Sequence, residues 1–191
     1  MEIVIPVYNA YDALLHCIKS LEKHSATEMV VFINDGSTDK RIQALLEQAC
    51  EGKSNWNVLN NDSNLGFVKT ANRGLKRTDG DTVLLNSDTL VSTGWLDGLK
   101  YASAHCEDLG TATPWSNNAE ICSFPETLKN NPVPERLDEL ATPLQNKHQA
   151  CFPELPTAVG FCMLVSAAAK RKVGYFDEQT FGHGYGEEND Y

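Results

Sequence analysis

The sequence of 191 residues lacks both a long apolar run and an excess of basic residues. No stretch approaches the roughly 20 apolar residues of a membrane-spanning helix, and the N-terminus lacks the basic start of a signal peptide. Lys and Arg number 16 against 26 Asp and Glu, which gives a formal net charge of −10. This balance argues against a general nucleic-acid binder, because such a protein needs a basic footprint. We therefore expect a cytoplasmic protein with no nucleic-acid partner and no transmembrane segment in this chain.

Two further absences concern metal and phosphate sites. The 6 cysteines form no CxxC pair and fit no zinc spacing, and several lie within apolar runs, which predicts reduced, structural thiols. Neither GxGxxG nor GxxxxGK[ST] occurs, which weakens the case for a dinucleotide-binding or P-loop protein. An acidic chain that binds phosphate groups must then rely on a helix N-terminus, a Lys or Arg, or a metal ion.

Apolar runs alternate with helical spacing over the first 112 residues. Strands are predicted at 2–7, 28–34, 55–60 and 81–86, and helices at 10–23, 42–49, 67–75 and 95–102. Strands that alternate with helices predict an α/β fold with a parallel sheet covered on both faces. Residues 1–112 are therefore expected to form a Rossmann-like nucleotide-binding half.

The character of the sequence changes after residue 113. A loop rich in Asn, Pro and Ser is predicted at 114–134, then a short helix at 134–140, a strand within 155–165 and a helix at 167–172. The glycine-rich, aromatic and acidic segment 174–191 has no periodicity, and a long loop of this composition is usually functional. The sequence stops without a closing signal, so we expect a single domain, 1–191, whose second half, 113–191, is incomplete.

Polar side chains follow the predicted strands. They occur at 6–9, at 34–37 and at 86–88, and Asn64 and Gly66 precede the third helix. Ligands of open parallel sheets bind beyond the carboxyl ends of the strands, so these groups should face one crevice. Asn86 and Asp88 would lie on one side and could hold a cation if the strand geometry persists, although such a stretch alone is more often a turn. Asp35 could accept a hydrogen bond from a base or cap the following helix.

The acidic end of the chain offers a candidate general base. Glu187 and Glu188 follow Gly184 and Gly186. Adjacent carboxylates can share a proton or have one raised pKa, which suits proton abstraction. The alternative is an exposed acidic turn in an already acidic protein.

Six short segments in this order resemble family 2 glycosyltransferases, which are inverting, nucleotide-sugar-dependent enzymes of the GT-A fold. The segments are VIPVYNA, NDGSTD, NLGFVKTANRG, LLNSD, VGFCML, and FDE followed by GYGEEND. They extend from residue 3 to residue 191, nearly the whole chain.

The resemblance implies a role for each of these segments. The expected nucleotide-binding residues are Pro6, Val7, Tyr8 and Asp35 at the base, Asn64 and Gly66 at the ribose and diphosphate, and Asn86 and Ser87. Asp88 would hold a divalent metal ion, Mn²⁺ or Mg²⁺, and the donor-sugar and acceptor side would include Gly160, Phe161 and Asp190. Glu188 would be the catalytic base, and Glu187 would orient the acceptor hydroxyl.

The implied activity is transfer of a hexosyl or deoxyhexosyl group, with inversion, from a UDP- or dTDP-linked sugar to a hydroxyl. The acceptor would be a glycan, a lipid-linked molecule or a protein, as in cell-surface polysaccharide biosynthesis, and the reaction would occur in the cytoplasm or at the cytoplasmic face of a membrane. Asn86 stands where the family has the first Asp of its Asp-x-Asp motif, and Glu188 stands where Asp is usual. These departures leave open an alternative, a non-catalytic nucleotide-sugar or glycan-binding module. A sugar nucleotidyltransferase would need a glycine-rich, basic loop at 8–12, where the sequence is YNAYD.

Overall fold

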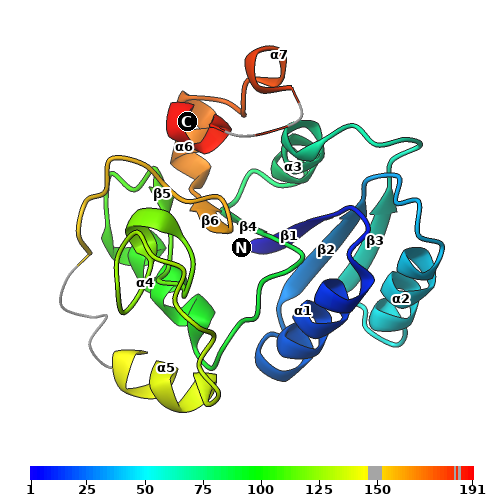
Figure 1. Ribbon diagram of the computed structural model, residues 1–191. Coiled ribbons are helices and arrows are strands. Elements are labelled where there is room, and N and C mark those ends of the chain that lie inside the picture. The colour runs from blue at the N-terminus through cyan, green and yellow to red at the C-terminus, as the bar shows by residue number, and fades with distance from the viewer. Residues whose placement is uncertain (146–151, 183, 185) are drawn as a thin grey trace.

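The computed structural model describes residues 1–145, 152–182, 184 and 186–191. It is an α/β structure in which helices pack on both faces of a six-stranded sheet (Figure 1). The elements in chain order are β1 (Glu2–Val7), α1 (Tyr11–His24), β2 (Met29–Asn34), α2 (Arg41–Cys50), β3 (Trp56–Asn60), α3 (Phe67–Leu75), β4 (Thr82–Leu85), α4 (Trp95–His105), β5 (Thr111–Ala112), the 3₁₀ helix η1 (Glu120–Cys122), α5 (Leu137–Gln145), β6 (Cys162–Val165), α6 (Ala167–Lys172), α7 (Glu178–Phe181) and α8 (Glu187–Asp190).

The sheet has the strand order β3-β2-β1-β4-β6-β5 and is parallel in its first four strands. This confirms the parallel arrangement predicted for residues 1–112. β6 runs antiparallel to both β4 and β5, so β5 points in the same direction as β4. The start of β6 therefore lies beside the carboxyl end of β4, and the polar ends of the parallel strands share one edge with the segment that precedes β6.

Two apolar clusters form the core, one on each face of the sheet. The first joins α1, α2 and α4 to side chains such as Ile3, Ile5 and Phe32. The second joins α3 and α6 to side chains such as Val4 and Val31. Successive residues of β1 thus point to opposite faces, and both faces are buried, which explains why its sequence is an unbroken apolar run.

From residue 111 onward the structure differs from the prediction in several places. The strand predicted within 155–165 is confined to 162–165, and the two-residue strand β5 was not predicted. The C-terminal segment was predicted to lack regular structure, but it contains the short helices α7 and α8. The helix predicted at 134–140 begins at residue 137, and the helix at 167–172 is confirmed.

The cysteines agree with the prediction of structural thiols. Five of them are free in the described part of the chain, whereas Cys151 lies outside it. Burial, with a smaller contribution from the nearby Asp88 charge, raises the pKa of Cys17 to about 12. Burial also raises the pKa of Cys162. Among the described helices, none combines the length and apolar character that crossing a bilayer requires.

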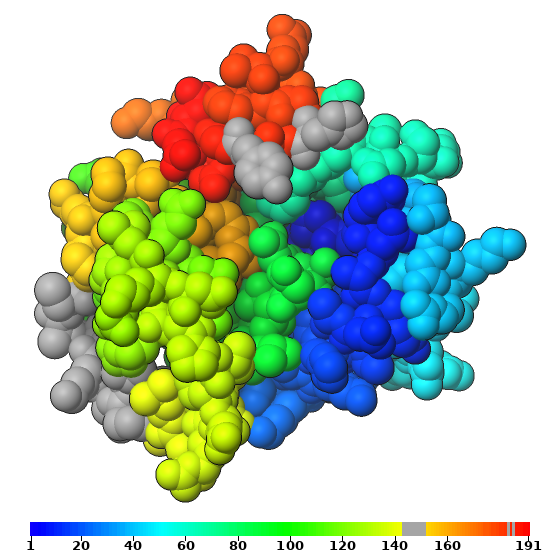
Figure 2. All heavy atoms as spheres, viewed as in Figure 1, coloured from blue at the N-terminus to red at the C-terminus, as the bar shows by residue number. Residues whose placement is uncertain are grey.

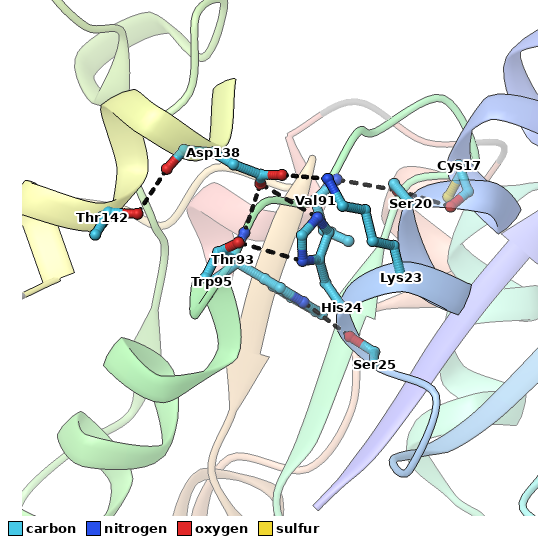
Figure 3. A network of polar contacts seen from close by, with 10 residues as sticks. All are labelled: Cys17, Ser20, Lys23, His24, Ser25, Val91, Thr93, Trp95, Asp138 and Thr142. Carbon is cyan, nitrogen blue, oxygen red and sulfur yellow. Dashed lines mark hydrogen bonds and ion pairs between the residues drawn. The ribbon is translucent and has the colours of Figure 1, made fainter. Parts of the chain in front are cut away.

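A polar network fastens α5 to the end of α1 and the start of α4 (Figure 3). The Asp138 carboxylate accepts the Thr93 N–H at 2.9 Å, lies 3.2 Å from His24 Nε2 and pairs with Lys23. The hydrogen bond from Lys23 is the largest cause that lowers the pKa of Asp138 to about 2. The network thereby attaches α5 to the end of α1 and to the segment that precedes α4.

Candidate functional site

The carboxyl ends of β1 and β2 are joined by the side chain of Asn9. Its Oδ1 accepts the N–H groups of Thr38 at 2.9 Å and Asp39 at 3.0 Å, and its own N–H donates to Ser37 Oγ at 3.0 Å. Asn9 has φ 58° and the following Ala10 has φ 55°, so the chain leaves β1 through two left-handed residues. This geometry fixes the two strand ends relative to each other before α1 begins.

The residues at the carboxyl end of β1 differ widely in their exposure to solvent. Tyr8 is 46% exposed at the rim of the sheet. Val7 is fully buried in the first core cluster, and its carbonyl accepts the Asp35 N–H at 2.8 Å. The expectation that Val7 lines the nucleobase site therefore does not hold for its side chain, because alternation turns that side chain into the core. Pro6 is partly exposed.

The Asp35 carboxylate holds the loop that precedes α3. It accepts the Asn61 amide at 2.7 Å and the N–H groups of Leu65 at 2.9 Å and Gly66 at 3.0 Å, and the residue is only 4% exposed. These three partners all belong to the loop between β3 and α3. A contact with a nucleobase edge remains a prediction. The structural alternative weighed from the sequence was a cap of the following helix, whereas these hydrogen bonds go to the loop before α3.

Gly36 allows that loop to approach the β2 end. Its φ is +63°, and a Cβ placed there would lie 2.6 Å from the backbone nitrogen of Asn64 and 2.6 Å from the carbonyl carbon of Ser63. No other residue fits without displacing the backbone. Asn64 in turn accepts the Gly66 N–H at 2.9 Å through its side chain, so the residues expected at ribose and diphosphate form one fixed turn at the N-terminus of α3.

At the tip of β4, the strand ends at Leu85 and the chain turns. The Thr89 N–H donates to the Asn86 carbonyl at 3.2 Å, which closes a β-turn over residues 86–89. The premise that strand geometry places Asn86 and Asp88 on one side is therefore wrong. Asp88 is exposed, and its side chain has no hydrogen-bond partner among the described residues, nor do those of Asn86 and Ser87.

The same strand tip contacts the segment that precedes β6. The Asn86 N–H donates to the Phe161 carbonyl at 2.8 Å, and Thr89 Oγ1 donates to the same carbonyl at 3.4 Å. Gly160 lies one residue earlier, and a Cβ placed there would lie 3.7 Å from Glu188 Oε1. A short chain of contacts thus connects the turn that contains Asp88, through its neighbours Asn86 and Thr89, to the segment beside Glu188. Figure 2 shows the face on which the green 86–92 segment and the orange segment before β6 meet below the red C-terminal end.

Glu188 is held at the start of α8. Its Oε2 is buried and has no hydrogen-bond partner in the described part of the structure, an uncommon state for a carboxylate oxygen. Thr157 fixes the helix, since its hydroxyl lies 3.2 Å from the Glu188 carbonyl and 2.7 Å from Asn189 Oδ1. The neighbouring Glu187 is 5% exposed, whereas Asp190 is exposed. A buried, unpaired carboxylate oxygen in a fixed position is suited to accept a proton from a bound hydroxyl.

The family model of glycosyl transferase family 2 matches residues 2–174 of the chain. The chain belongs to glycosyl transferase family 2. A search of curated protein sequences found no match.

Solved structures agree with this membership and show the GT-A fold. S. aureus TarS 1–349 superposes with a TM-score of 0.66 at 19% identity, over 99% of this chain and 53% of that one. GalNAc-T7 with UDP, GalNAc and Mn²⁺ gives 0.70 at 14% identity, over 99% and 39%. The mannosyltransferase PcManGT from Pyrobaculum calidifontis, in complex with GDP-Man and Mn²⁺, gives 0.67 at 12% identity, over 98% and 49%. The chain spans about half the length of these proteins or less.

The β4 tip of this family 2 domain has the chemistry that a hard divalent cation prefers. The described residues contain no cluster of three or more His, Cys, Asp or Glu side chains. At this tip the candidate oxygen ligands are the Asp88 carboxylate and the Asn86 amide, which belong to the same turn of residues 86–89. Mg²⁺ commonly binds through one or two carboxylates together with substrate phosphates and water, and Mn²⁺ also prefers oxygen ligands. The residues present fit such a cation when a diphosphate completes its coordination.

Sequence reasoning placed Asn9 among the polar residues at the strand ends, but it assigned no individual role to Asn9, Asn61 or Thr157 in the candidate site. Asn9, Asn61 and Thr157 each join segments that lie at least 9 residues apart in the chain. Asn9 directly follows a buried strand, and that position was its only signal. Nothing in the sequence around Asn61 or Thr157 indicated their partners.

Proposed function

We propose that this domain transfers a hexosyl or deoxyhexosyl group from a nucleotide-diphosphate sugar to an acceptor hydroxyl, with inversion at the anomeric carbon. The observation that carries the proposal is the contact chain from the β4 tip through Phe161 and Gly160 to Glu188. It supports a single site in which a diphosphate near Asp88 and a nucleophilic hydroxyl near Glu188 lie on opposite sides of the transferred sugar.

Each protein group has a defined task in this proposal. Asp88, assisted by Asn86, holds the divalent ion, which when bound offsets charge that builds up on the leaving diphosphate. Glu188 takes the proton of the acceptor hydroxyl as that oxygen forms its bond to the anomeric carbon and the bond to the diphosphate oxygen breaks. A single displacement of this kind inverts the configuration. Glu187 is proposed to orient the hydroxyl.

The donor is proposed to be UDP- or dTDP-linked, with Asp35 and the exposed Tyr8 at the base. The comparison proteins are in complex with UDP in one case and with GDP-Man in another, so a purine nucleotide belongs in the test. Melting temperatures should be measured with UDP, dTDP and GDP, with and without Mn²⁺. A pyrimidine nucleotide should stabilise the protein, and a shift caused only by GDP would contradict the assignment.

Turnover is tested by release of nucleotide diphosphate from UDP-, dTDP- and GDP-sugars. Glu188→Gln should lower kcat by at least 100-fold and leave Mn²⁺-dependent nucleotide binding intact, because only the proton acceptor is removed.

Asp88→Asn should abolish the Mn²⁺ dependence of binding, whereas Asn86→Asp should strengthen Mn²⁺ binding by adding a second carboxylate. Asp62→Asn, an exposed carboxylate in the loop before α3, is the matched control. Binding without any sugar release would favour the alternative of a non-catalytic nucleotide-sugar-binding module.

A further inference from the structure

The loop of residues 113–131, between β5 and α5, exposes large apolar side chains. Trp115 is 53% exposed and Phe124 is 38% exposed, and their ring centroids lie 6.4 Å apart with an angle of 58° between the ring planes. Leu128 is 72% exposed in the same loop. Neighbouring aromatic rings that remain exposed on a folded protein are candidates for a binding surface.

Hydrogen bonds fix this loop in place. The Asn131 side chain is almost fully buried and donates to the carbonyls of Asn117 at 3.2 Å and Glu126 at 2.9 Å. The Asn117 side chain donates back to the Asn131 carbonyl at 2.9 Å, and the Phe124 N–H donates to the Ser116 carbonyl at 2.8 Å. The rings therefore sit on an ordered backbone, and binding to them requires little further ordering of the loop.

The loop starts beside the candidate base. Thr113 Oγ1 accepts the Val159 N–H at 3.1 Å, and Val159 directly precedes Gly160. Gly160 is the residue whose Cβ position lies 3.7 Å from Glu188 Oε1. Trp115 follows two residues after Thr113, so the exposed rings belong to the segment that leaves the acceptor side of the proposed site. In Figure 2 the yellow-green loop lies next to the orange segment before β6.

The chemistry of the loop favours an uncharged partner. Residues 113–131 carry three charged side chains, Glu120, Glu126 and Lys129, and the last two form an ion pair with each other. The other side chains of the loop are aromatic, amide, hydroxyl or apolar groups. A sugar presents a C–H face that packs on an aromatic ring, and its hydroxyls pair with amides such as the exposed Asn118. A phosphate- or carboxylate-rich polymer would find only one basic side chain in this loop, Lys129, which is paired with Glu126.

We propose that Trp115 and Phe124 form a binding surface for a neutral glycan, and that this glycan is the acceptor. The binding of a neutral glycan stands on the loop itself, whereas its role as acceptor rests on the proposed function. A glycan that extends from the Glu188 side across Trp115 to Phe124 presents its terminal hydroxyl to the base.

Binding is tested on the full chain by acrylamide quenching of tryptophan fluorescence. Trp56 is 2% exposed and Trp95 is partly buried, whereas Trp115 is 53% exposed, so the quenching reports mainly on Trp115. The probes are three neutral trisaccharides, one each of glucose, rhamnose and N-acetylglucosamine. The binding of each neutral probe is compared with that of a uronic-acid trisaccharide. A neutral trisaccharide should protect Trp115 from quenching, and replacing Trp115 by Phe should remove the signal.

Variants then locate the surface, with binding followed by saturation-transfer NMR. Trp115→Ala and Phe124→Ala should each weaken binding of the neutral trisaccharide by about tenfold, a change of ~1.4 kcal/mol. Leu128→Ala removes an exposed apolar side chain from the same loop and should change little. Equal affinity in Trp115→Ala and the unchanged protein would overturn the proposal. Preferred binding of the uronic-acid probes, no binding at millimolar concentration, or self-association through Trp115 would overturn it as well.

Kinetics separate this proposal from the transfer reaction. With a donor that turns over, Trp115→Ala should raise the acceptor KM about tenfold and leave both the donor KM and the hydrolysis of donor by water unchanged. An unchanged acceptor KM would refute the acceptor role. If no nucleotide sugar is turned over but the neutral trisaccharide still protects Trp115, the transfer reaction is refuted and the glycan-binding surface is supported.

Discussion

The buried carboxylate of Asp35 offers the sharpest test of how the nucleotide side of the site is built. It accepts hydrogen bonds from Asn61 at 2.7 Å, from the Leu65 N–H at 2.9 Å and from the Gly66 N–H at 3.0 Å. In Asp35→Asn one acceptor oxygen becomes an amide donor. At least one of these three donors then faces another donor, and the remaining bonds lose their ionic character.

The expected cost is about 2 kcal/mol in the free energy of unfolding, since a hydrogen bond to a charged group contributes about 1.5–3 kcal/mol. For a chain of this size, 1 kcal/mol shifts the melting temperature by about 2–4 °C, so a decrease of roughly 4–8 °C is expected. Urea denaturation followed by circular dichroism gives the free energy, and a thermal melt gives the temperature. Asp62→Asn, on the same loop but exposed, should change the free energy by less than about 0.5 kcal/mol.

The same variant separates two roles of the carboxylate. If Asp35 acts mainly by holding the loop before α3, Asp35→Asn loses stability and nucleotide affinity together. If it loses UDP affinity with unchanged stability, the base contact is the main role. A variant as stable as the unchanged protein, with full UDP affinity, would refute both the structural reasoning and the assignment at the base.

Three further substitutions probe the scaffold. Ala10→Gly should raise the free energy of unfolding by about 0.5 kcal/mol in urea, because Ala10 has φ 55° and glycine adopts that conformation without strain; a loss of stability would contradict the strain. Gly74→Ala should cost about 1–3 kcal/mol in the same assay, since the new Cβ would lie 2.2 Å from Val4 Cγ1, and a change below 0.5 kcal/mol would show that the core adjusts. Asp138 has a pKa lowered to about 2, so its stabilising pairing with Lys23 is complete above pH ~4 and is lost as the pH falls toward 2. Asp138→Asn should remove that part of the pH dependence of the melting temperature, an effect below about 1 kcal/mol because the pair is partly exposed, and identical pH profiles would argue against it.

Periodicity was enough to predict the first half of the fold. The runs in β1, β2 and β4 and the helical spacing in α1 to α4 are local patterns, and each matches an element of the structure within a few residues. β5 has only two residues and α8 only four, which is too short for a pattern to emerge. Their positions depend on partners far away in the chain, such as Thr157 for α8 and β6 for β5.

In the candidate site, too, some features could be predicted from local sequence patterns and others could not. The residue types at the strand ends were read correctly as one edge, because parallel strands place their carboxyl ends together. The inward direction of Val7, the turn at Asn86 and the buried bonds of Asp35 depend on contacts between segments 26 or more residues apart, or on the exact end of a strand. No local sequence pattern encodes those.

The antiparallel strand β6 explains how the two halves of the chain can share one site. A parallel strand beside β4 would place its own start at the opposite edge of the sheet, far from the polar strand ends. Because β6 is antiparallel, with Cys162 opposite Leu85, the segment that enters it reaches the carboxyl edge of β4 directly, and Phe161 bonds to Asn86 there. Gly160, which has no side chain and is next to Phe161 in the chain, leaves room for the Glu188 carboxylate. In the proposed function, the parallel strands supply the nucleotide side and the antiparallel strand supplies the acceptor side. Substitutions in residues 113–131 are then expected to alter acceptor choice while the residues proposed to bind the nucleotide stay in place.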